Sequence, residues 1–227
     1  YFAIPAVVKM YCKLLRIVDK EGNCSVDKFV ANSEVVQNRI SRYYDTDSEV
    51  IYPPISGNWR NEKDDGYFVT WSRLDPKKRI DLIIEAFAEL DKQLVVAGTG
   101  PEESKLRSLA APHDNIVMKG YVDDIESLVA NATAVVYAPL EEDFGMVGAE
   151  ALCAGKPLIG VNQGFTKHQV SSTTGVTFSP TVESLVDTVE SFNPEKYDSD
   201  EIQTIGQRYE YDQFKNDIRM VVSHLID

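Results

Sequence analysis

Strand-like and helical segments alternate along the chain from Tyr67 to Val161, and this alternation restricts the possible folds more than any other feature. Short apolar runs bounded by turn residues are separated by stretches whose apolar residues recur at helical spacing. Repeated strand–helix order predicts an α/β fold, a Rossmann-like, doubly wound parallel sheet with helices on both faces. We expect strands at 67–71, 93–97, 115–119, 134–138 and 157–161, helices between them at 81–90, 102–110, 124–130 and 148–154, and two terminal helices at 181–192 and 213–225.

The segment before this alternation is organised differently. Its opening run, Ala3 to Val18, carries apolar residues at helical spacing and predicts a helix packed on a sheet. Three cations interrupt the run, a pattern also found in helices that lie on a lipid surface. A short buried strand at Lys28 to Ser33, ending in an N-cap, and a helix through Tyr44 are expected next. Prolines favour extended chain at 50–55, and the polar segment 57–66 predicts a loop at a domain boundary.

Composition excludes several classes of protein. The 227 residues are 43% hydrophobic and 26% charged, as in an ordinary globular protein. A net charge of −13 argues against nucleic-acid partners, so an anionic ligand would need a local group of cations. The three cysteines lie far apart without CxxC spacing, as in a reduced cytoplasmic protein. The histidines are isolated, so no metal site is expected.

Two carboxylates, Glu142 and Glu150, stand eight positions apart around a Phe144-Gly145 step, where an expected strand is followed by an expected helix. A strand that ends in a loop opening a helix is where parallel α/β sheets bind phosphorylated ligands. Glycine in the loop allows backbone amides, here those around Phe144, Gly145 and Met146, to approach a ligand closely. A carboxylate only accepts hydrogen bonds and therefore suits a vicinal diol. The pattern predicts a nucleotide-sugar site.

Three further segments follow expected strands, and each has a plainer alternative. Arg73 and Lys78 lie across a proline turn, where both could meet one diphosphate or simply form a solvated basic turn. Gly98-Thr-Gly100-Pro could bring backbone near a ligand or be a structural turn, and it lacks the rest of a dinucleotide fingerprint. Lys119 and Gly120 end a strand whose backbone could bind a base edge, or they are structural alone.

Together these segments resemble the donor-binding half of a GT-B glycosyltransferase of the large retaining family 4, most closely its mannosyltransferase-like members. The resemblance covers about residues 25–190. Its most specific element is E-x7-E at Glu142 to Glu150. The accompanying motifs, in matching order, are F-V-A-N-S at 29–33, V-I-Y-P-P at 50–54, R-L-x-P-x-K at 73–78, G-x-G-P at 98–101, E-A-x-x-x-G-x-P-x-I at 150–159 and T-G-V-x-F-x-P at 174–180.

The resemblance implies roles for these residues. Arg73 and Lys78 would hold the donor diphosphate, Glu150 the ribose hydroxyls and Glu142 the donor sugar, with Glu142, Arg73 and Lys78 as the catalytic group. The remaining donor-binding positions implied are Phe144, Gly145, Met146, Gly98, Gly100, Lys119 and Gly120. Such enzymes transfer a hexose from a nucleoside-diphosphate sugar, retain the anomeric configuration and need neither metal nor cofactor. GDP-mannose is the leading donor expected, followed by a UDP-hexose.

The resemblance also implies a domain organisation. Residues 1–48 would be the end of an N-terminal acceptor domain, 49–66 a linker, 67–208 the nucleotide-sugar domain, and 209–227 a helix that crosses back to the N-terminal domain. The acceptor would be a glycan or a lipid-linked sugar, and the location cytoplasmic, with peripheral contact at the inner face of the membrane through the acceptor domain. Without most of that domain, this chain alone is expected to be inactive.

The chain departs from the family pattern at one motif, and three other functions are alternatives to the transferase. Where the family often has Gly-Gly-x-x-Glu, this chain has Gly164 to His168, and we interpret His168 as a loop residue. A nucleotide-sugar-binding or assembly module without catalysis would share the same motifs. A nicotinamide-dependent oxidoreductase is disfavoured by the incomplete fingerprint. A glycosidase needs two carboxylates facing each other across a sugar, whereas Glu142 precedes the expected helix and Glu150 lies inside it.

Overall fold

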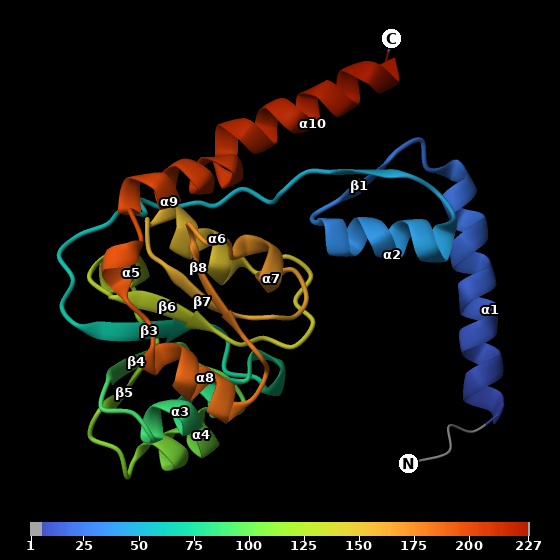
Figure 1. Cartoon of the computed structure of the whole chain (residues 1–227). Coiled ribbons are helices and arrows are strands. Elements are labelled where there is room, and N and C mark those ends of the chain that lie inside the picture. The colour runs from blue at the N-terminus through green and yellow to red at the C-terminus, as the bar shows by residue number, and fades with distance from the viewer. Residues whose placement is uncertain (1–5, 227) are drawn as a thin grey trace.

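The computed structural model describes residues 6–226, and its main body is one parallel sheet covered by helices on both faces (Figure 1). The strand order is β5-β4-β3-β6-β7-β8, with every neighbouring pair parallel. The strands are β3 (Tyr67–Trp71), β4 (Gln93–Ala97), β5 (Ile116–Gly120), β6 (Ala134–Tyr137), β7 (Leu158–Val161) and β8 (Gly175–Phe178). The predicted doubly wound α/β fold is confirmed.

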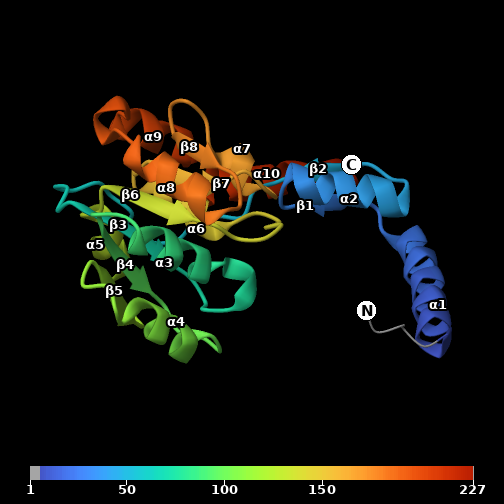
Figure 2. The ribbon, with the colours of Figure 1, turned by 60° about the horizontal axis from the view of Figure 1, so that its bottom comes forward.

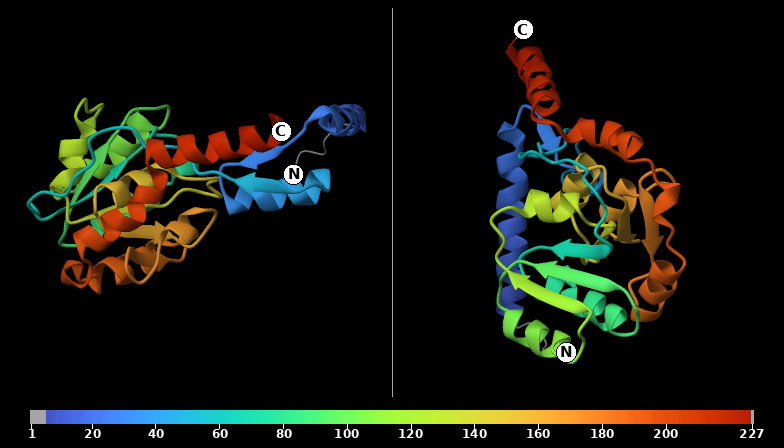
Figure 3. Two further views of the ribbon diagram at one scale, coloured as in Figure 1. Left: turned by 90° about the horizontal axis from the view of Figure 1, so that it is seen from above. Right: turned by 90° about the vertical axis from the view of Figure 1, so that its left-hand side faces the viewer.

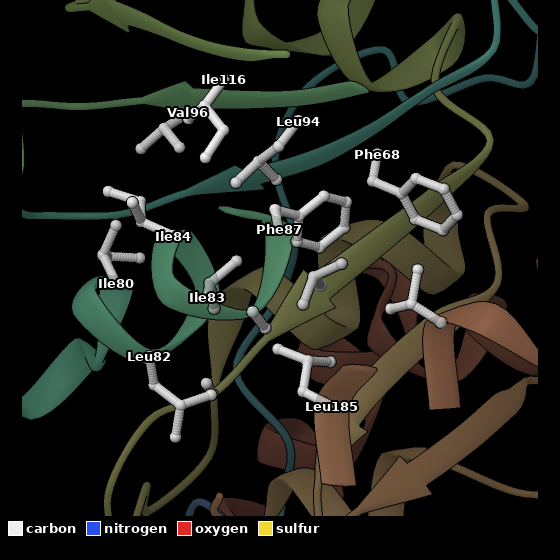
Figure 4. Close-up of a cluster of buried hydrophobic side chains, with 14 of the residues drawn as sticks. Phe68, Ile80, Leu82, Ile83, Ile84, Phe87, Leu94, Val96, Ile116 and Leu185 are labelled. Atoms are coloured by element: carbon white, nitrogen blue, oxygen red, sulfur yellow. The ribbon is translucent and has the colours of Figure 1, made fainter. Parts of the chain in front are cut away.

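Helices cover the two faces of this sheet separately, each with its own core. One face packs against α3 (Ile80–Ala88), α4 (Glu103–Ala110) and α8 (Val182–Glu190). The other packs against α5 (Ile125–Ala130) and α6 (Met146–Cys153). Figure 4 shows the first core, in which Phe87 of α3 lies between Leu94 of β4 and Phe68 of β3. Alternate residues of each strand point to opposite faces, so central strands buried on both faces are almost wholly apolar.

A third cluster lies beside α6 and contains most of the buried aromatic residues outside the sheet. The helices around it are α7 (Thr166–Gln169) and α9 (Ser199–Gly206), the latter packed on α6. Phe144, Phe165 and Tyr209 are buried in it, and their rings lie against Tyr52 of the segment that precedes β3. Ile55 N–H donates to the Tyr209 carbonyl at 2.7 Å, which ties the same segment to the C-terminal part of the chain.

The N-terminal part forms a small unit of its own to one side of the main sheet (Figure 2). It contains α1 (Ala6–Gly22), β1 (Phe29–Ala31), α2 (Glu34–Tyr44) and β2 (Ser48–Val50), with β1 and β2 parallel. Ser33 caps α2, as predicted, by accepting a hydrogen bond from the Val36 N–H at 3.3 Å. The predicted helix from Ala3 begins outside the described residues.

Several predicted elements need correction. The strand predicted at 28–33 is shorter and is not buried throughout, because within β1 Val30 is 40% exposed and only Ala31 is buried. The strand β8 and the helices α7 and α9 were not predicted. Strand β8 and α7 have four residues each, too few for a period to be recognised. His168 lies in α7 and stacks on the Phe165 ring, so its interpretation as a loop residue was wrong.

The last helix, α10 (Tyr211–Ile226), leaves the main body and extends toward the side on which β1 and α2 lie (Figures 1 and 3). Only Val221 of this helix is fully buried. Across residues 6–226, none of the helices has both the length and the apolar character needed to span a bilayer. The expected crossing of α10 to an N-terminal domain stays a prediction.

Candidate functional site

The candidate site lies at the centre of the sheet, where the chain changes its direction of winding. From β3 the chain proceeds outward to β4 and β5, whereas from β6 it proceeds the opposite way to β7 and β8. Strands β3 and β6 are neighbours, and the loops that leave their carboxyl ends carry Arg73 and Glu142. Ligands of open α/β sheets bind at such a switch point. Topology therefore places two separate predicted segments at the same edge of the sheet.

An ion pair and a backbone bond join these two loops directly. The Lys78 ammonium lies 2.7 Å from Oε2 of Glu142, with both side chains partly exposed. Leu140 N–H donates to the Lys77 carbonyl at 2.8 Å. Beneath the pair, Lys78 Nζ lies 3.5 Å from the hydroxyl of buried Tyr137, the last residue of β6. Burial and the nearby Glu142 carboxylate raise the pKa of Tyr137, so its hydroxyl stays protonated.

Glu150 faces a different neighbour. It lies inside α6, and its Oε2 accepts a hydrogen bond from Trp71 Nε1 at 3.0 Å. The helix begins after Gly145, whose φ of +81° lies in the left-handed region and whose carbonyl accepts from Gln169 Nε2 at 3.0 Å. A left-handed residue before the helix turns the loop so that Met146 is its first helical residue. Glu142 and Glu150 thus hold different positions along the edge.

Two cavities open on the loops after β3. The first has a volume of about 670 Å³ and is lined by Arg73, Trp71, the Gly98–Gly100 turn and the segment from Tyr121 to Asp123. The second has about 620 Å³ and is lined by Lys78, Glu142, Asp143 and Arg39. The structure therefore brings Lys78 and Glu142 together on one cavity and places Arg73 on the other.

The glycine turn after β4 is shaped by the loop after β3. A Cβ built on Gly98, where φ is +120°, would lie 1.9 Å from the Ser72 carbonyl oxygen. A Cβ built on Gly100 would lie 2.4 Å from the Leu74 carbonyl oxygen. The Leu74 N–H donates to the Thr99 carbonyl at 2.9 Å. Both glycines are thus needed for the packing of two backbones, whatever they also contact in a ligand.

The other predicted donor-binding residues divide into buried and exposed positions. The Phe144 side chain is 4% exposed and belongs to the aromatic cluster, so only its backbone faces the loop. Met146 is 42% exposed at the start of α6. Lys119 is exposed, and Gly120, which is buried, accepts a hydrogen bond from Gly98 N–H at 2.7 Å. Lys119 does not line either of the two cavities.

Sequence reasoning missed the residues that hold the Glu142 loop from behind. Ser33 Oγ donates to the Asp143 carbonyl, and the Arg39 guanidinium of α2 pairs with the Asp143 carboxylate. Phe165 N–H donates to the Glu142 carbonyl at 2.8 Å. Ser33 and Arg39 are more than a hundred positions from Asp143, so no local spacing could have indicated these contacts. Among residues 6–226, no group of three or more His, Cys, Asp or Glu side chains is placed to hold a metal ion.

Glu150→Gln is expected to change how stability depends on pH. Burial is the main cause that raises the pKa of the Glu150 carboxyl above its ordinary value of 4.5, and the Trp71 hydrogen bond opposes it. Because the folded protein holds this proton more tightly than the unfolded chain, the protonated carboxyl favours the folded state. That contribution to the free energy of unfolding is complete below pH 4.5 and is lost as the pH rises through the pKa of the folded state. Between those two pKa values, the free energy of unfolding of the wild-type protein should therefore fall relative to that of the Glu150→Gln variant.

Urea denaturation at several pH values measures this difference. Glu85→Gln, which removes a carboxylate at an exposed position of α3, is the matched control variant and is measured at the same pH values. A difference between wild type and Glu150→Gln that does not change with pH would contradict the prediction.

Comparison with known proteins identifies the family to which this chain is similar. Residues 53–207, more than half of the chain, match the family described as Glycosyl transferases group 1. The GtfA subunit of a UDP-N-acetylglucosamine–peptide N-acetylglucosaminyltransferase from Streptococcus pneumoniae is 28% identical over 60% of this chain. The α-1,3/1,6-mannosyltransferase ALG2 of Saccharomyces cerevisiae is 25% identical over 72% of it. These alignments cover 30% and 44% of the two relatives, so the chain spans less than half of either.

Solved structures share the fold. The crystal structure of Anabaena HepE in complex with UDP and glucose superimposes with a TM-score of 0.78 at 20% identity, over 92% of this chain and 66% of that one. At this identity the likeness concerns the fold, which is that of GT-B glycosyltransferases.

Proposed function

The chain belongs to the group 1 glycosyl transferases, and we propose that it binds a nucleoside-diphosphate sugar across the β3/β6 edge of its sheet. One observation carries this proposal. Two cations and two carboxylates from separate segments, Arg73, Lys78, Glu142 and Glu150, lie on the loops and helix that follow the two strands at the switch point. A sugar nucleotide needs both kinds of group, cations for its diphosphate and hydrogen-bond acceptors for its hydroxyls.

In this proposal each charged side chain has a separate role. Arg73 and Lys78 bind the diphosphate from the two cavities, so the anion lies between them and their charges stabilise the leaving group. An ammonium has three donors, and Lys78 can therefore keep its bond to Glu142 while it binds a phosphate oxygen. Glu150 accepts from the ribose hydroxyls and Glu142 from the donor sugar. The amides at Gly145 and Met146 approach the sugar or phosphate at the start of α6.

The class of donor is also part of the proposal. GDP-mannose is preferred and a UDP-hexose comes next. The name of ALG2 as a mannosyltransferase supports the first, and the UDP and glucose in the HepE complex support the second. Transfer with retention of configuration, without metal, to a glycan or lipid-linked acceptor completes the proposal for the whole protein, with peripheral membrane contact outside the donor domain. For this chain alone, which spans less than half of those relatives, we propose donor binding without turnover.

Calorimetric titration with GDP, UDP and ADP, with and without an attached mannose or glucose, tests the proposal. Arg73→Ala and Glu150→Gln should each lower the affinity for the tightest-binding nucleotide at least about tenfold, because each variant loses a charge-assisted hydrogen bond of roughly 1.5–3 kcal/mol. Lys92→Ala and Glu85→Gln are the matched controls. Lys92 is an exposed cation before β4, at the opposite edge of the sheet, and Glu85 is exposed on α3. Unchanged affinity in both site variants would refute the assignment.

A binding or assembly module without catalysis is the second candidate. The observation that favours it is the relative found in a two-protein assembly, the GtfA/B complex, which resembles this chain with a TM-score of 0.73. Transfer or donor hydrolysis by the complete protein separates the two candidates, since a module without catalysis binds the donor and releases it unchanged.

A further inference from the structure

Trp71 lies at the carboxyl end of a central strand, against the candidate site. It is the last residue of β3 and is 8% exposed. It lines the 670 Å³ cavity together with Arg73. Its indole N–H donates to Oε2 of Glu150 at 3.0 Å. Among residues 6–226 no other side-chain hydrogen bond reaches the Glu150 carboxylate.

A second tryptophan fixes the orientation of the first. Trp59, from the segment before β3, stacks on Trp71 with ring centroids 6.0 Å apart and an interplanar angle of 24°. Its own indole N–H donates to the Ser56 carbonyl at 2.8 Å, so Trp59 is held by its own segment. Strand pairing fixes the Trp71 backbone and this stack restrains its ring. The indole N–H is therefore aimed at Glu150 by two independent restraints.

We infer that Trp71 is a positioning residue, whose indole N–H holds one oxygen of Glu150 and leaves the other free to accept a hydrogen bond from a ligand at this edge of the sheet. Phenylalanine or tyrosine on the same strand position could fill similar space, but neither has a donor at the place of the indole nitrogen. The identity of that ligand group as a ribose hydroxyl rests on the proposed function. The link between Trp71 and Glu150 does not.

The electrostatic surroundings make this link measurable. Burial raises the pKa of Glu150 most, the nearby Glu126 of α5 raises it further, and the Trp71 hydrogen bond lowers it. The other titratable groups that sense the Glu150 charge are Tyr137 of β6 and Cys153 of α6, and burial raises the pKa of both above their ordinary values. Neither therefore ionises in the range where a carboxyl titrates. Loss of the indole N–H should leave the burial in place and shift Glu150 ionisation to higher pH.

The sequence makes fluorescence a specific probe, because Trp59 and Trp71 are the only two tryptophans in the chain. In Trp59→Phe, all tryptophan emission comes from Trp71. We expect that emission to change as the pH passes through the ionisation of Glu150, and the change to vanish when Glu150→Gln is added. Glu126→Gln is the matched control and should shift the transition without removing it. A pH transition that is unaffected by Glu150→Gln, or no transition at all, would overturn the inference.

Nucleotide titrations at several pH values supply the second measurement. Trp71→Phe should weaken binding of the tightest-binding nucleotide about tenfold, which corresponds to the loss of one hydrogen bond to a charged group. It should also move the midpoint of the plot of affinity against pH to higher pH. Trp59→Phe keeps the Trp71 N–H and should leave that midpoint in place. Equal midpoints for Trp71→Phe and wild type would contradict the positioning role. If the unsubstituted chain binds no nucleotide, the proposed function fails, whereas the fluorescence titration still decides whether Trp71 holds Glu150.

Discussion

Gly98→Ala is expected to lower the free energy of unfolding by about 3–5 kcal/mol, one of the largest effects available to a single methyl group in this chain. Two causes act together. The φ of +120° at Gly98 is strained for any residue with a side chain, and the new Cβ would lie 1.9 Å from the Ser72 carbonyl oxygen. That oxygen belongs to the backbone that leaves β3, so no flexible side chain can move aside. Either the turn after β4 or the loop that carries Arg73 must shift.

Gly66→Ala separates these two causes. Gly66 also has a positive φ, +82°, but a Cβ built there meets nothing within 4 Å. It should therefore lose only the conformational part, about 1–2 kcal/mol. Urea denaturation of both variants measures the difference. Equal losses would mean that the contact between the turn and the Ser72 carbonyl is relieved at little cost, which contradicts the close backbone packing described for this edge.

The result also bears on nucleotide binding. Since Gly98 and Arg73 line the same cavity, a displaced Ser72 carbonyl would move the backbone next to Arg73. Nucleotide affinity in Gly98→Ala, measured where the variant is still folded, should fall with stability. Gly66→Ala should keep its affinity. The glycine turn is thus a structural requirement of the site even without direct ligand contact.

The sequence predicted the fold because the main sheet depends on local patterns. Its central strands are buried on both faces and read as apolar runs, and the helices between them carry their apolar residues at helical spacing. The last part of the sheet was harder to predict. Strand β8 begins at Gly175 and has one fully buried hydrophobic residue, Phe178, so its four residues resemble a loop.

The candidate site was predictable only in part, because only some of its contacts join residues that are close together in the sequence. Glu142 and Glu150 stand in one loop and helix, where spacing along the chain reports their relative placement. The partners that orient them are distant in sequence, 64 positions for Lys78 with Glu142 and 79 for Trp71 with Glu150. Such contacts arise from sheet order and helix packing. A single sequence without the three-dimensional arrangement does not indicate them.

Phe144 illustrates the limit of a motif most clearly. It stands between the two carboxylates of E-x7-E, where backbone amides are predicted to approach the donor, and its side chain points away into the aromatic cluster, which the motif alone does not indicate. Its ring lies 5.5 Å from that of Phe165 in a stacked arrangement and 5.5 Å from that of Tyr209 edge-on. A motif gives the order of residues along the chain, but the direction of each side chain depends on the turn that Gly145 makes.

Phe144→Ala is therefore expected to cost about 3–5 kcal/mol of unfolding free energy, because the truncation leaves a cavity among aromatic rings that cannot all collapse. Met146→Ala, two positions along and 42% exposed, should change stability by roughly 0.5 kcal/mol or less. Phe144→Leu keeps most of the buried volume and should retain nucleotide affinity, since the side chain lines neither cavity. Denaturation and calorimetry on the three variants check both points. A stable Phe144→Ala protein with lost nucleotide binding would show that the ring acts on the ligand and not in the core.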